Sequence, residues 1–118
     1  MAEYFRRGDI VRVRLDPTEG SEQGGVRPAV VLSPDLINAS SPVILVAPLT
    51  TKKKDRLFPF EALLMPQLGG LPMISKAPLM QMKSIDKLRV VSSIGKASPA
   101  EIQQIDKAIQ IAAGLQHL

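Results

Sequence analysis

The segment that decides the fold, residues 9–32, reads DIVRVRLDPTEGSEQGGVRPAVVL. Apolar and polar side chains alternate from Asp9 to Leu15, which predicts a strand with one buried face. Residues 28–32 form a short continuous apolar run, which predicts a central strand. The polar stretch between them holds three glycines, which let a backbone turn sharply and approach a ligand closely. This stretch is typical both of a plain hairpin loop and of a loop that places polar groups for binding.

Shorter patterns downstream predict the rest of a β-rich fold. Residues 43–48 are typical of a second buried strand, and residues 35–40 of one loose helical turn. The cationic run at residues 52–56 predicts a charged, mobile loop. Later stretches complete the β part: a strand within 58–64, a turn at 66–72, one or two strands within 72–81, and a last strand at 88–94.

The C-terminal helix is the clearest local prediction. Ser98 begins a Ser-Pro-Ala-Glu capping box with proline at the first helical position. Apolar residues then recur at helical spacing, and Gly114 provides a C-terminal stop. The apolar stripe consists of Ile102, Ile105, Ile109 and Ala112.

Six or so short strands followed by one helix predict a mainly β protein. We expect a small, strongly curved β-barrel with the C-terminal helix packed on one side. The strands are joined by short loops without alternating helices, which argues against a doubly wound parallel sheet. A chain of 118 residues is long enough for one hydrophobic core, so we expect a single domain over residues 1–118.

Composition excludes several kinds of chemistry. Without cysteine, disulfides, thiolate nucleophiles and cysteine metal sites are excluded, and the one histidine, His117, excludes a histidine acid–base pair. The net charge of +4 favours a polyanionic partner. An aromatic content of 3% argues against a single-strand binder that relies on stacking. Because no signal peptide and no long apolar span is present, we expect a cytoplasmic protein without membrane association.

Polar residues at the ends of the predicted strands are the candidates for function. Because neighbouring strand ends converge in a compact barrel, we expect these residues to line one groove. Each also has an ordinary structural explanation, such as a solvated charge or a hydrogen bond at a strand end. The candidates are Glu22 and Gln23 in the glycine-rich loop, Arg27 after it, Thr50, Thr51 and Lys52 after the second buried strand, and Ser75 and Gln81 around a later strand.

These residue types favour phosphodiester chemistry driven by arginine. The chain lacks the histidine and cysteine arrangements of nucleophilic triads, and no Gly-Lys-Ser/Thr follows the glycines as in a nucleoside-triphosphate loop. RNA supplies its own nucleophile, the 2′-hydroxyl, so an enzyme needs only to align it, accept its proton and stabilise charge on phosphorus. The guanidinium of Arg27 suits the nonbridging phosphate oxygens, and the hydroxyl of Thr50 can add a second donor.

Taken together, these motifs resemble the MazF/PemK family of toxin endoribonucleases. The resemblance is most specific in the glycine-rich block and extends over nearly the whole chain. One departure is Lys83-Ser84, where the family usually has Arg-Thr, because lysine cannot make the bidentate contacts of arginine. The resemblance is carried by Arg7-Gly8-Asp9-Ile10-Val11, residues 15–18, residues 20–31, Asn38, Ser41-Pro42, residues 46–50, residues 81–87 and the C-terminal helix.

The resemblance implies an SH3-like barrel of the MazF, Kid and CcdB toxin type, working as a homodimer. It implies sequence-specific cleavage of single-stranded RNA to a 2′,3′-cyclic phosphate and a free 5′-hydroxyl, with neither metal nor cofactor. It also implies a cognate antitoxin whose flexible acidic tail covers the RNA groove. The family's catalytic residues fall on Arg27 and Thr50, and its RNA-contacting positions on Glu22, Gln23, Ser75 and Gln81.

Two other functions remain open from the sequence. A gyrase poison like CcdB, on the same barrel, would bind a protein target and cleave nothing. A catalytically silent module would bind RNA or an antitoxin. Fold alone does not separate these functions, because function lies in the site. The glycine-rich loop with Arg27 favours the ribonuclease.

Overall fold

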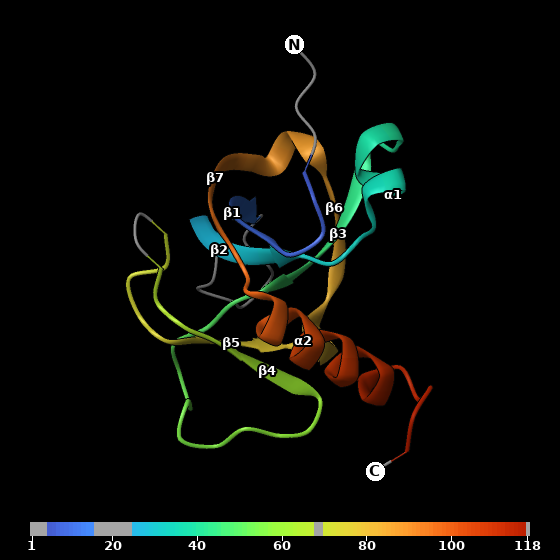
Figure 1. Cartoon of the computed structure of the whole chain (residues 1–118). Helices are drawn as coiled ribbons and strands as arrows, with labels where there is room; N and C mark the ends of the chain where they lie inside the picture. The colour runs from blue at the N-terminus through green and yellow to red at the C-terminus, as the bar shows by residue number, and fades with distance from the viewer. Residues whose placement is uncertain (1–4, 16–24, 68–69, 118) are drawn as a thin grey trace.

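The structure is a computed structural model that describes residues 5–15, 25–67 and 70–117 (Figure 1). Its strands are β1 (Asp9–Leu15), β2 (Gly25–Val31), β3 (Val43–Pro48), β4 (Glu61–Leu64), β5 (Ser75–Pro78), β6 (Lys83–Asp86) and β7 (Val90–Lys96). Its helices are α1 (Asp35–Ser40) and α2 (Pro99–Ala112), with single 3-10 turns η1 (Leu79–Gln81) and η2 (Lys87–Arg89).

The strands form two antiparallel sheets that lie against each other. The larger sheet has the order β6-β3-β2-β1-β7, and the smaller one pairs β4 with β5. A single bridge between Thr50 and Lys76 links the two sheets. The prediction of a mainly β fold with a C-terminal helix is confirmed. Among the described residues the large sheet does not close into a continuous ladder, because β6 and β7 form its two edges.

Most predicted elements lie where the sequence placed them. The strands at residues 9–15 and 43–48 and the helical turn at 35–40 have the expected bounds. β2 begins at Gly25, earlier than predicted, because its first residues pair with the end of β1. The strand predicted within 58–64 is confined to β4, since the Glu61 amide donates to the Phe58 carbonyl in a turn.

Two elements near the end of the β part were predicted wrongly. β6, which pairs with β3 along the sheet edge, was not predicted at all. The last strand begins at Val90, because the preceding residues form the 3-10 turn η2. The Asp86 side chain caps that turn by accepting a hydrogen bond from the Leu88 amide.

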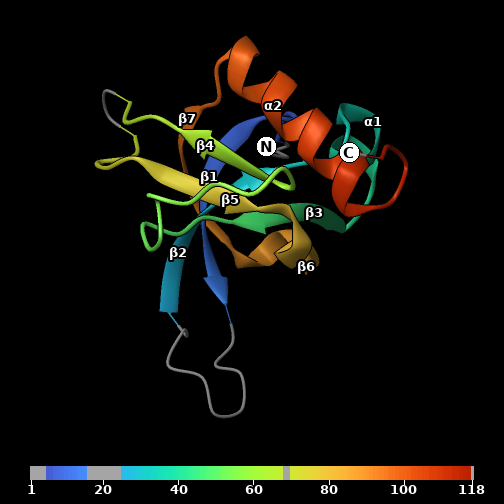
Figure 2. The same cartoon turned by 90° about the horizontal axis from the view of Figure 1, so that it is seen from below.

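The large sheet buries both of its faces. One face packs against the β4–β5 sheet and α2, which crosses that small sheet (Figure 2). The other face lies inside the curve of the large sheet and forms a second cluster that contains Val11, Val13, Val31 and Val46. Where β2 begins and β3 ends, residues on this second face reach the surface. These residues can therefore form a site that is held in place by the strands of the large sheet.

Helix α2 has the predicted cap and stripe. The Ser98 hydroxyl accepts from the Glu101 amide, and the Glu101 carboxylate accepts from the Ser98 amide, so both parts of the capping box are present. Ile105 is fully buried, and the other stripe residues pack around it. No helix among the described residues is long and apolar enough to span a membrane.

Candidate active site

Arg27 lies near the start of β2, the central strand of the large sheet. The β2–β3 ladder pairs Ala29 with Pro48, and the same register places Arg27 opposite Thr50. The Arg27 side chain is half-buried, and its Nη2 donates to the Leu49 carbonyl at 3.4 Å. That bond uses one of five guanidinium donors. The others have no hydrogen bond to any residue that the structure describes, so the fork remains able to bind an anion.

Thr50 follows β3 and is held by its neighbours on both sides. Its amide donates to the Lys76 carbonyl at 3.0 Å, and its own carbonyl accepts from the Lys76 amide at 2.8 Å. The Thr50 hydroxyl oxygen accepts from the Lys52 amide at 3.1 Å. Because that oxygen acts as an acceptor here, the hydroxyl proton stays available for donation to a ligand.

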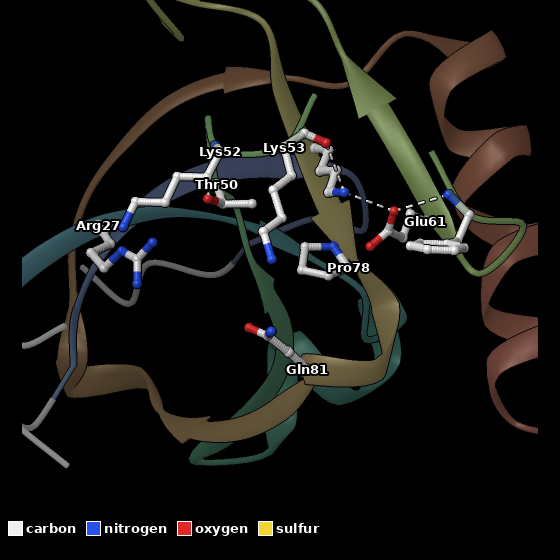
Figure 3. A pocket seen from close by; sticks show the side chains of 9 residues that line it. Arg27, Thr50, Lys52, Lys53, Glu61, Pro78 and Gln81 are labelled. Atoms are coloured by element: carbon white, nitrogen blue, oxygen red, sulfur yellow. Dashed lines mark hydrogen bonds and ion pairs between the residues drawn. The ribbon is translucent and has the colours of Figure 1, made fainter. Parts of the chain in front are cut away.

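Arg27 and Thr50 line the same pocket, which has a volume of about 440 Å³ (Figure 3). Lys52 and Gln81, two other residues predicted from the sequence, line it too. The expected convergence of strand ends therefore exists for these four residues. Five lining residues were not predicted: Lys53, Phe58, Glu61, Lys76 and Pro78.

The open side of the pocket is cationic. Lys52 and Lys53 are exposed, and both side chains extend into the space bordered by Arg27, Pro78 and Gln81 (Figure 3). Among the residues that the structure describes, the lining holds one carboxylate beside the side chains of Arg27, Lys52 and Lys53, and a buried lysine neutralises it. This charge distribution suits a polyanion.

That carboxylate belongs to Glu61, which forms an ion pair with Lys76 at 2.9 Å. Both side chains are buried, with exposed fractions of 6% for Lys76 and 8% for Glu61. Sequence reasoning missed this pair. Ala77 of β5 faces the core, so its neighbour Lys76 faces the opposite side, where a charged residue is ordinarily solvated.

Phe58 stands at the edge of the pocket as an exposed aromatic ring. It stacks on Phe60 with ring centroids 5.4 Å apart and planes nearly parallel. The guanidinium carbon of Arg56 lies 6.0 Å from the Phe58 ring centroid. The low aromatic content of the sequence had argued against such a platform, yet the fold concentrates two of the few aromatic rings here.

Two other predicted residues, Ser75 and Thr51, are not brought into the pocket. Ser75 is buried, and its hydroxyl donates to the Met73 carbonyl at 3.1 Å. Thr51 is exposed but does not line the pocket. Glu22 and Gln23 lie outside the described residues. Their predicted contacts with RNA therefore stay predictions.

The arrangement suits charge stabilisation on a phosphodiester. Arg27 can donate two parallel hydrogen bonds to nonbridging oxygens, and the Thr50 hydroxyl can donate a third. Lys52 and Lys53 form no ion pair with any residue that the structure describes, so they can add positive charge for neighbouring phosphates. Within residues 5–15, 25–67 and 70–117, no cluster of three or more acidic or histidine side chains that could hold a metal ion is present.

The fold and the pocket thus define a small, mainly β protein with a cationic site for a polyanion. The chain belongs to the family of PemK-like, MazF-like toxins of type II toxin–antitoxin systems, which it matches over residues 6–113. It is 40% identical over 112 residues to endoribonuclease MazF9 of Mycobacterium tuberculosis. That alignment covers 91% of this chain and 94% of the relative.

Solved structures support the same relationship. MazF from Deinococcus radiodurans has a TM-score of 0.75 and 26% identity, with 96% of this chain and 99% of that chain covered. A mycobacterial endoribonuclease in complex with its cognate antitoxin has a TM-score of 0.76 over 96% of this chain and 98% of that chain. At 20% identity, this similarity shows a shared fold and nothing more. The predicted family and its barrel-like fold are confirmed, and the family match favours a MazF-like toxin over a CcdB-like gyrase poison.

Proposed function

We propose that this protein is a cytoplasmic endoribonuclease toxin that cleaves single-stranded RNA at preferred sequences. The observation that carries the proposal is the shared pocket of Arg27 and Thr50, with the cations of Lys52 and Lys53 beside them. Membership of the MazF-like toxin family supports the same activity. So does 40% identity to a relative named as an endoribonuclease.

The reaction uses a nucleophile within the substrate. The ribose 2′-oxygen loses its proton and attacks the adjacent phosphorus, while the bond from phosphorus to the 5′-oxygen breaks. The leaving oxygen takes up a proton, so the products are a 2′,3′-cyclic phosphate and a free 5′-hydroxyl. Arg27 and Thr50 donate to the nonbridging oxygens, where negative charge grows in the transition state. No metal is part of this scheme.

Recognition of the RNA extends beyond the reacting phosphate. We assign contacts with the neighbouring nucleotides to Gln81 and Lys52 in the pocket and to Thr51 beside it. The predicted contacts of Glu22 and Gln23 belong to the same proposal. The protein works as a homodimer, and a cognate antitoxin with an acidic, disordered tail covers the cationic pocket and blocks RNA.

The test incubates purified protein with a long RNA in EDTA and maps the new 5′ ends. We expect cleavage at a small set of sequences, 5′-hydroxyl ends and cyclic phosphates. Arg27→Ala should remove cleavage and keep the fold, as judged by circular dichroism. Arg12→Ala is the matched control, since Arg12 is exposed on β1, outside the pocket lining, and carries the same charge. Intact RNA across many sequences, or activity lost only on chelation, would contradict the proposal.

A further inference from the structure

We propose that Lys76 is a positioning residue for RNA binding. Together with Glu61, it fixes the segment of residues 51–60 so that Lys52 and Lys53 face the pocket. This inference rests on the proposed function and adds a part to it: the cations that meet the RNA backbone are held in place by a buried ion pair.

The ammonium group of Lys76 is fully used within the protein. Its Nζ contacts the Glu61 carboxylate at 2.9 Å, the Lys53 carbonyl at 3.1 Å and the Arg56 carbonyl at 2.9 Å. An ammonium group has three donors, and all three have acceptors here. Two of the three acceptors are backbone carbonyls of the cationic segment. Lys76 therefore holds this segment through hydrogen bonds to the backbone of the segment. The side chains of the segment take no part in these bonds and can point outward.

Glu61 completes the attachment from the other end. Its Oε1, which pairs with Lys76, also accepts a hydrogen bond from the Phe58 amide at 3.0 Å. Residues 53, 56 and 58 are thus all tied to one buried ion pair. Glu61 and Lys76 lie on β4 and β5, which are hydrogen-bonded to each other. The ion pair therefore anchors the segment to a rigid sheet.

The backbone of Lys53 independently indicates that the segment is held. Its φ angle of 57° lies in the left-handed region, and it is the one described residue other than glycine with a positive φ. A side chain with Cβ makes this conformation unfavourable, so it persists where surrounding contacts impose it. The Lys53 carbonyl is one of the two held by Lys76. In this conformation the Lys53 side chain lines the pocket.

Stability alone does not explain why charged residues stand here. A buried ion pair contributes little more than an apolar pair of similar size, because both charges must be desolvated. An apolar residue at position 76 would fill the space but could not bind two carbonyl groups. The charge of Lys76 therefore matters for where the segment lies, and the segment carries the cations for RNA.

The test replaces the pair by neutral residues of similar size in the double variant Lys76→Met/Glu61→Gln. Lys107→Met is the control, because Lys107 is an exposed lysine on α2, outside the pocket lining. The segment contains Lys52, Lys53, Lys54 and Arg56, so trypsin reports directly on its attachment. We expect trypsin to nick the folded double variant within residues 52–56 about tenfold faster than the wild type or the control, since local opening exposes these bonds.

RNA binding is measured on a 2′-O-methyl oligonucleotide, which cannot be cleaved. We expect affinity to fall about tenfold in the double variant, with a shallower salt dependence because fewer phosphates are neutralised at once. On cleavable RNA, KM should rise by about the same factor, while kcat changes by less than about threefold. A folded double variant with wild-type nicking or wild-type RNA affinity would overturn the proposal.

A further measurement uses the wild-type protein alone, so its result does not depend on whether the double variant folds. Trypsin should nick residues 52–56 of the intact protein about 100-fold more slowly than a synthetic peptide of residues 50–61. Equal rates would overturn the proposal even if the double variant fails to fold. A wild type that neither binds nor cleaves RNA would instead contradict the proposed function, and the nicking rates would still decide whether Lys76 holds the segment.

Discussion

Arg27 and Thr50 face each other across the end of the β2–β3 ladder. The Leu49 amide donates to the Pro28 carbonyl at 2.9 Å, which continues the ladder register beyond the last assigned pair. Proline has no amide proton to return, so this pair makes one bond where two are usual. Continued by one more residue, this register sets Arg27 opposite Thr50, and both side chains line the pocket. Two ordinary strands thus bring the guanidinium and the hydroxyl into one pocket.

Arg27→Lys should lower the cleavage rate about 100-fold or more. Lysine keeps the charge but loses the planar fork that donates to two phosphate oxygens at once. The measurement is kcat on a mapped cleavage site. The fold should remain, because the Arg27 side chain makes one long hydrogen bond to a described residue. Arg12→Lys, on another strand and outside the pocket lining, should change kcat by less than about twofold. Full activity of Arg27→Lys would show that charge alone suffices.

Thr50→Val should reduce kcat about 100-fold, since it removes one preorganised donor without changing size. It also removes the acceptor for the Lys52 amide. Thr50→Ser keeps the hydroxyl and should stay within about threefold of the wild type. Ser93→Ala, which removes an exposed hydroxyl of β7 outside the pocket lining, is the control. If Thr50→Val cleaved as fast as Thr50→Ser, the hydroxyl would have no part in the reaction.

Ser98→Ala should destabilise the protein by about 1 kcal/mol, because α2 loses the acceptor for its Glu101 amide. Urea denaturation followed by circular dichroism measures the change. Ser93→Ala, an exposed position in β7, should change stability by less than about 0.5 kcal/mol. An unchanged midpoint for Ser98→Ala would mean that water replaces the cap at no cost.

Asn38→Ala should lower the free energy of unfolding by about 2 kcal/mol, because it removes the side chain that pairs with the buried polar groups of Ser33. The Asn38 side chain is fully buried; its amide nitrogen donates to the Ser33 carbonyl at 2.8 Å, and its oxygen accepts from the Ser33 hydroxyl. That hydroxyl also accepts from the Leu45 amide, so the network joins α1 to β3. Urea denaturation again measures the loss. Ser40→Ala, exposed on the same helix, should cost less than about 0.5 kcal/mol.

Local patterns predicted the elements that depend on local forces. The alternation of Asp9–Leu15 and the cap and stripe of α2 were both realised, since side-chain periodicity and capping act within a few residues. β6 was missed, because a short edge strand with exposed polar residues has little pattern of its own. Its pairing with β3 creates it.

The candidate site was likewise predicted in part from the sequence and decided in part by the tertiary structure. Residue chemistry and family resemblance pointed to Arg27, Thr50, Lys52 and Gln81, and the pocket contains all four. Ser75 was expected in the groove, but its hydroxyl is buried against Met73 within this subunit.

The sequence by itself determined that this chain forms a basic, mainly β domain with a C-terminal helix and an arginine suited to phosphate. Only the tertiary structure decided that Lys76 and Glu61 are buried. Both lie on strand positions that face away from the core and would ordinarily be solvated. The segment of residues 51–60 folds over them, and its carbonyl groups replace the water that the ammonium group would otherwise keep. Burial of a charge depends on what distant chain covers it, and no local pattern encodes that.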